Sequence, residues 1–79
     1  MTYEQALEVA RADYNVGISY AIDTLKDMGF DCSQYYKTMA EVSVDDEDFD
    51  DKNTLARNTL FITLGIYEIM RQAYEEVWQ

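Results

Sequence analysis

The sequence contains no histidine, no proline and only one cysteine, Cys32, in 79 residues. A lone cysteine cannot form a disulfide within the chain, and without histidine the usual four-ligand zinc sites cannot be built. The missing histidine also removes the commonest general base and the serine–histidine pair of many hydrolases. The three glycines, Gly17, Gly29 and Gly65, are far apart, so no glycine-rich phosphate loop exists. We therefore expect no metal, no cofactor and no enzymatic activity.

Basic residues are scarce, with 6 lysines and arginines against 16 acidic residues and a formal net charge of −10. Direct binding to nucleic acid or to an anionic membrane is disfavoured, because both need cations on the protein. A basic protein surface is the natural complement of such a chain. We therefore predict that the partner is the basic surface of a nucleic-acid-binding protein.

Long apolar runs are also absent, since the longest stretch, Leu60–Met70, is interrupted by Thr63, Gly65 and Glu68. A bilayer-spanning helix needs about 20 apolar residues, so no membrane partner is expected. The first residues, MTYEQALEVARADY, are polar and acidic, unlike a secretory signal. Together with the unpaired cysteine, this predicts a cytoplasmic protein.

The length allows one domain, residues 1–79, and 48% of the residues are hydrophobic. Apolar residues recur at three- and four-residue steps, which is typical of helices. Thr2 and Gln5 form a predicted capping box at the start of a long helix over Tyr3–Met28, and Gly29 with Phe30 predicts a Schellman stop. A glycine in the middle of a helix is unfavourable, and Gly17 lies at such a position. The apolar residues keep the same helical spacing on both sides of it, so one continuous helix is predicted.

A second capping box, Asp31 with Gln34, predicts a short helix that ends near Glu41. A third, long helix is predicted to begin with Asp50 or Asp51 as its cap and to continue to about Val77. The predicted fold is therefore all-α, a three-helix arrangement in the order long, short, long. Its first and third helices are antiparallel, and an acidic loop lies between the second and third.

Six acidic residues fall within seven positions, and they hold six of the ten excess negative charges: Asp45, Asp46, Glu47, Asp48, Asp50 and Asp51. A calcium-binding EF-hand does not fit, because Asp51 stands where that loop needs glycine and Arg57 where it needs glutamate. Two interpretations stay open: a solvated loop that caps a helix, or an anionic patch that binds a partner.

Further candidates for partner binding come from the helices. Glu4 and Glu8 lie one helical turn apart, as do Asp23 and Asp27, and carboxylates on a rigid frame can occupy a groove built for phosphates. The seven tyrosines are many for this length, and tyrosine is enriched in binding hot spots. Tyr14 and Tyr67 lie on apolar stripes and are predicted to be core. The predicted exposed contact residues are Tyr20, Tyr35 and Tyr36, with the alternative that all tyrosines line the core.

In size, charge and lack of motifs, the chain resembles the anti-restriction and anti-CRISPR proteins of phages and mobile elements. That resemblance implies a stoichiometric inhibitor whose acidic surface blocks the basic nucleic-acid-binding groove of a target. Colicin-nuclease immunity proteins are also small, acidic and helical, and Asp31 with Tyr35-Tyr36 resembles their aspartate–tyrosine–tyrosine segment. The spacing differs and Lys37 replaces the proline that should follow, so that family is not assigned.

The alternative function is a homodimeric helical interaction module without nucleic-acid mimicry. Its third helix would pair through four residues, and the acidic loop would only keep the chain in solution. These residues are Leu60, Leu64, Tyr67 and Met70. Salt separates the two hypotheses, because binding to a basic target weakens steeply as ionic strength rises.

Overall fold

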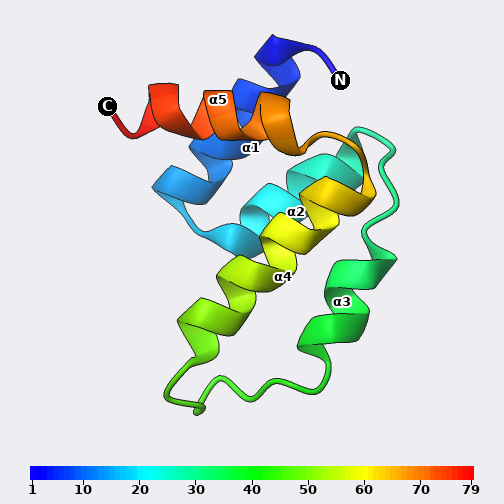
Figure 1. Cartoon of the computed structure of the whole chain (residues 1–79), viewed down its shortest axis with the longest axis vertical. Helices are drawn as coiled ribbons and strands as arrows, with labels where there is room; N and C mark the ends of the chain where they lie inside the picture. Colours follow the sequence, from blue (N-terminus) through cyan, green and yellow to red (C-terminus); the bar gives the residue numbers. More distant parts are fainter.

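Five α-helices and no β-strand make up the computed structural model, which describes all 79 residues (Figure 1). The helices are α1 (Tyr3–Asn15), α2 (Ile18–Asp27), α3 (Ser33–Met39), α4 (Phe49–Thr63) and α5 (Tyr67–Val77). The all-α class is confirmed. The three-helix arrangement is wrong, because each of the two long predicted helices is divided at a glycine.

The first division lies at Gly17. The predicted capping box at the start of α1 is present, with the Thr2 hydroxyl accepting from the Gln5 amide and the Gln5 side chain accepting from the Thr2 amide. α1 then ends, and Gly17 precedes α2 with a φ of 152° that L side chains rarely adopt. The turn lets α2 pack back on α1, so the apolar residues of the two helices cover one another. A single helix over Tyr3–Met28 would have left much of that stripe in water.

The second division lies at Gly65, which has a φ of 72°. The Gly65 amide donates to the Ile62 carbonyl at 3.0 Å and the Ile66 amide to the Phe61 carbonyl at 2.9 Å, which together form a Schellman stop. The same pattern at Gly29, after α2, confirms the stop predicted there. The prediction of one helix that continues through Gly65 to Val77 was wrong, because the chain turns at Gly65 and α5 packs on α1.

The predicted caps of the other two helices are also corrected. Ser33 is the first residue of α3, and its amide donates to the Asp31 carboxylate at 3.0 Å, without the reciprocal bond from Gln34. α4 begins at Phe49, so Asp50 and Asp51 lie inside its first turn instead of capping it. There they still meet the positive end of the helix dipole. The acidic run is thus divided between the connection before α4 and the helix itself.

The helices pack around a single cluster of buried side chains, with α4 in contact with α2, α3 and α5. Figure 1 shows α4 running from the connection after α3 at the lower end towards α5, which lies across the upper end together with α1. The largest fully buried side chains are Val9, Ile22, Leu25, Leu60, Phe61 and Met70. None of the helices has the length and apolar character needed to cross a membrane.

Candidate protein-binding site

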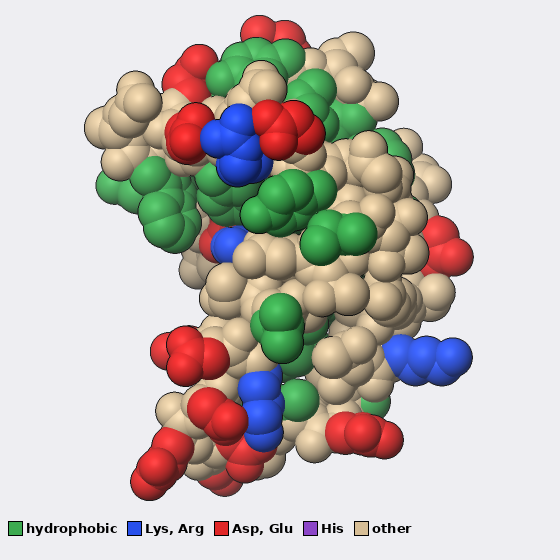
Figure 2. Space-filling model, viewed as in Figure 1, with side chains coloured by type: hydrophobic (Ala, Val, Ile, Leu, Met, Phe, Trp, Pro, Cys, Tyr) green, Lys and Arg blue, Asp and Glu red, His purple; other side chains and the backbone are tan.

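The strongest concentration of charge is the segment 41–52, which we call the acidic tip. It contains seven carboxylates and one lysine, so its formal charge is 1 − 7 = −6, more than half of the chain's −10. Figure 2 shows acidic side chains gathered at the lower end of the molecule, where this segment joins α3 to α4. The other acidic residues are spread over the remaining helices.

Short-range bonds fix the backbone of the acidic tip. The Asp46 amide donates to the Ser43 carbonyl at 3.0 Å, and the Phe49 amide donates to the Asp46 carbonyl at 3.1 Å. The Ser43 hydroxyl accepts from the Asp45 amide at 3.2 Å, and the side chain of Phe49 is half-buried. The carboxylates therefore project from a structured turn at the start of a helix.

Lys52 is the only cation that pairs within the acidic tip, with its Nζ 3.4 Å from Asp46 Oδ2 and 3.4 Å from Asp48 Oδ1. Hydrogen bonds and attraction from Asp48, and then from Asp46, raise the pKa of Lys52. Asp45, Glu47, Asp50 and Asp51 are exposed and have no ion pair. No group of carboxylates converges in a way that could hold a metal ion. The acidic tip thus presents unneutralised negative charge to the solvent.

The other predicted carboxylates are exposed but lie elsewhere. Glu4 and Glu8 are on α1, at the upper end of Figure 1, and the acidic tip is at the lower end. Asp23 and Asp27 are on α2, where Asp23 accepts a 3.4 Å hydrogen bond from the Tyr36 hydroxyl. The fold therefore does not bring all the predicted acidic residues onto one continuous surface.

Two of the three tyrosines predicted to be exposed are so: Tyr20 is 55% exposed and Tyr36 is 42% exposed. Tyr35 is buried, which corrects its predicted exposure. The packing of α3 against α4 encloses its ring, and its hydroxyl donates to Asn53 Oδ1 at 2.5 Å. A contact with a residue 18 positions away cannot be predicted from helical periodicity.

The two tyrosines predicted to be core are exposed. Tyr14 lies near the end of α1, is 61% exposed and packs beside Trp78, with ring centroids 6.2 Å apart. Tyr67 is the first residue of α5 and is 41% exposed. Both predictions were wrong because they assumed that one apolar helix face continues past the point where the helix ends, at Gly17 and at Gly65.

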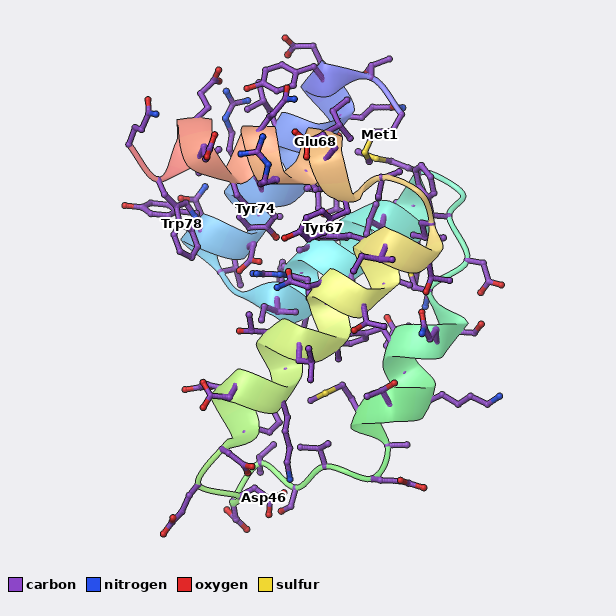
Figure 3. All side chains as sticks on the ribbon, in the orientation of Figure 1. Met1, Asp46, Tyr67, Glu68, Tyr74 and Trp78 are labelled. Atoms are coloured by element: carbon purple, nitrogen blue, oxygen red, sulfur yellow. The ribbon has the colours of Figure 1, made fainter.

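Sequence reasoning missed a groove between α4 and α5, which we call the aromatic groove. Its volume is about 340 Å³, and Figure 3 shows Tyr67, Tyr74 and Trp78 along the edge of α5 that faces α4, far from Asp46 in the acidic tip. The groove is lined by Arg57, Asn58, Phe61, Tyr67, Arg71, Tyr74, Glu75 and Trp78. Aromatic side chains at its edge offer apolar contact area.

Three residues that line the aromatic groove, Arg57, Asn58 and Tyr74, belong to a polar network that also includes Asp13. Arg57 Nη1 lies 2.8 Å from Asp13 Oδ2, and the Tyr74 hydroxyl donates to the same oxygen. The Arg57 side chain is 12% exposed and that of Asp13 is 8% exposed. Asn58 Oδ1 accepts from Nε and Nη2 of Arg57, and the guanidinium carbon is 4.7 Å from the Tyr74 ring centroid. Burial, together with the hydrogen bond to Asp13, raises the pKa of Tyr74 strongly. These contacts join α1, α4 and α5, and the two charges, on Asp13 and Arg57, are paired with each other.

The four residues predicted to form a homodimer do not form an exposed surface on which two copies could pair. Leu60 is 1% exposed and Met70 is 0% exposed, because both belong to the core, and Leu64 is partly buried. Tyr67 alone among the four is exposed. Pairing through this set is therefore corrected, because the division at Gly65 turns Leu60 and Met70 inward.

No protein-family model, no curated protein sequence and no solved structure matches this chain. Its function is therefore inferred from its own charges and contacts. The acidic tip and the exposed apolar side chains are the features that a partner would meet.

Proposed function

We propose that this chain is a stoichiometric protein-binding inhibitor, not an enzyme, and that its acidic tip docks on the basic nucleic-acid-binding surface of a target protein. The observation that supports this proposal is the formal charge of −6 within residues 41–52, carried by carboxylates that are mostly unpaired. Occupied by these carboxylates, the target's surface is closed to nucleic acid.

The physical reason is that lysine and arginine side chains in such a surface are arranged to bind phosphates. Carboxylates can replace phosphates as hydrogen-bond acceptors for those side chains, and they restore the charge balance that nucleic acid would provide. The turn around Ser43 and Asp46 is already structured, so docking orders little additional backbone. Opposite fields also speed the encounter of the two proteins.

The remaining predicted carboxylates have a lesser part. Glu4 and Glu8 are on α1, which lies towards the other end of the molecule from the acidic tip (Figure 1). They, like Asp23 and Asp27 on α2, add to the net charge that steers the encounter. The direct contacts in this proposal come from residues 45–51.

A displacement assay tests the proposal. Purified basic DNA- and RNA-binding proteins are each loaded with a fluorescent oligonucleotide, and the release of the oligonucleotide is followed by anisotropy as this chain is added. We expect at least one protein of this basic panel to lose its oligonucleotide when one equivalent of this chain is added. The displacement should weaken as the salt concentration rises. Failure to displace any nucleic acid across the basic panel would contradict the proposal.

A charge-matched pair of variants separates the acidic tip from net charge. One variant replaces four tip carboxylates by their amides, at Asp45, Asp46, Asp48 and Asp50. The control replaces four others, at Glu4, Glu8, Asp23 and Asp27, so both variants have a formal charge of −10 + 4 = −6. The tip variant should lose displacement at least about tenfold, or about 1.4 kcal/mol, and the control should keep it. Equal losses in both would show that only overall charge matters.

A further inference from the structure

The outer face of α4 carries large apolar side chains that no part of the chain covers. Leu55 is 66% exposed and Ile62 is 64% exposed. They are seven residues apart, so they lie on one side of the helix, two turns from each other. Asn58 and Thr59 lie between them on that side. We call these four residues the α4 face.

The α4 face lies in the one long part of the chain that has no acidic residue. Residues 53–67 contain no aspartate or glutamate, although the average content of 16 in 79 would place about three in a run of this length. The only charge there is that of Arg57, which is paired with Asp13. Figure 2 looks onto α4 and shows acidic side chains at both ends of the molecule and around its edge, with hydrophobic and uncharged side chains between them.

We propose that the α4 face pairs with the α4 face of a second copy of this chain. A copy with a net charge of −10 is repelled by every acidic part of the surface, so self-association is least opposed where acidic residues are absent. A two-fold axis near Asn58 and Thr59 makes the face complementary to itself, because Leu55 then packs on Ile62 of the second copy. The centre of the contact is uncharged.

The same charges select the orientation of the pair. In a parallel pair, the two acidic tips would lie side by side, and two formal charges of −6 would repel one another. In an antiparallel pair, the acidic tips lie at opposite ends of the dimer. They also stay open to a basic partner, so pairing is compatible with the proposed function but does not depend on it.

The contact is small, which sets its expected strength. α4 has 15 residues and is therefore about 22 Å long. A standard stable interface buries about 800 Å² on each partner, which is about a sixth of the 5069 Å² surface of this chain. A contact between two single helices buries less, and we expect a dimer that forms in the micromolar range and dissociates on dilution.

Sedimentation equilibrium between about 5 and about 500 μM tests this pairing, a range chosen to span the expected dissociation constant. The full chain should pass from monomer to dimer, and higher salt should strengthen the dimer because it screens the repulsion between copies. Leu55→Lys and Ile62→Lys should each weaken it at least about tenfold, which is about 1.4 kcal/mol. Both side chains are exposed, so the variants should keep their helical circular dichroism.

Val44→Lys is the matched control, because Val44 is 77% exposed, lies outside the α4 face and undergoes the same change of charge. It should dimerise as well as the wild type or slightly better. A chain that stays monomeric throughout the range overturns the proposal. A dimer that Leu55→Lys and Ile62→Lys leave intact does so too.

Cross-linking with a short bis-maleimide tests the antiparallel geometry. Cys32 is 3% exposed and should not react in the folded chain, so Thr59→Cys supplies the reactive thiol. In an antiparallel pair, the two copies of residue 59 meet near the axis, and those of residue 63 are separated by about 13 Å along the helix. Thr59→Cys should therefore give a covalent dimer and Thr63→Cys should not. Equal cross-linking at both positions would overturn the antiparallel arrangement.

Discussion

Arg57 on α4 and Asp13 on α1 form an ion pair across 44 residues of sequence, with Nη1 2.8 Å from Oδ2. Both side chains are nearly enclosed. Tyr74 on α5 donates to the same carboxylate oxygen, so one aspartate connects three helices. A buried ion pair of this kind costs desolvation energy, and removing one partner leaves the other charge without compensation.

Removal of the cation alone should therefore be strongly destabilising. We expect Arg57→Met to lower the free energy of unfolding by about 3–5 kcal/mol, as measured by urea denaturation, because the Asp13 carboxylate is left buried without its cation. The double variant Arg57→Met with Asp13→Asn removes both charges and keeps an oxygen for the Tyr74 hydroxyl. It should recover most of the loss. A double variant less stable than Arg57→Met would contradict this role of the ion pair.

Tyr74 makes stability fall at alkaline pH. Its pKa is raised by burial and by the hydrogen bond to Asp13, whereas a tyrosine in the unfolded chain ionises near pH 10. The unfolded chain therefore loses this proton first, and the stabilisation is complete below about pH 10 and declines above it. Urea midpoints between about pH 8 and about pH 11 should fall steeply in the wild type and less steeply in Tyr74→Phe. Identical pH profiles would exclude Tyr74 as the cause.

Gly65 fixes the turn between α4 and α5 through its backbone alone. A methyl group at this position would meet no atom within 4 Å, but the φ of 72° is unfavourable for any residue with a Cβ. We expect Gly65→Ala to cost about 1–2 kcal/mol in unfolding free energy. Thr63→Ala, at the exposed end of α4, is the control and should be nearly neutral. Equal stability of the two variants would show that the turn does not need glycine.

Cys32 should be chemically inert in the folded chain. It is 3% exposed, and burial, with a further contribution from Asp31, raises the pKa of its thiol. A thiol reacts as its thiolate, so labelling by a disulfide reagent should be slow in native buffer and immediate in urea. Fast labelling of the native chain would show that α3 and the segment before it open readily.

Local features of the sequence were the most predictable part of the fold. The capping box of Thr2 with Gln5 and the Schellman stop at Gly29 depend on residues only three to five positions apart, and both are present. Gly65 followed by Ile66 has the same pattern as Gly29 followed by Phe30. The apolar residues on both sides of Gly65 instead favour one continuous helix to about Val77, which is the prediction that the structure corrects. In the structure, this apolar run contains the turn between α4 and α5, and its buried side chains belong to the core.

The polar contacts beside the aromatic groove were less predictable, because they join residues that are far apart in the sequence. Asp13, Arg57 and Tyr74 are ordinary polar residues of their own helices, and only the packing of α1, α4 and α5 brings them together. Tyr35 is buried for a similar reason, through its contact with Asn53. The charge of the acidic tip, in contrast, is visible directly in the composition of one short segment.

A nuclear magnetic resonance footprint is the most direct test of docking through the acidic tip. Backbone amide shifts of labelled chain are recorded as a displaced nucleic-acid-binding protein is added at a one-to-one ratio. The largest changes should fall within residues 41–52, and they should diminish as salt rises. Changes centred on the aromatic groove or on α1, with residues 41–52 unaffected, would contradict docking through the acidic tip.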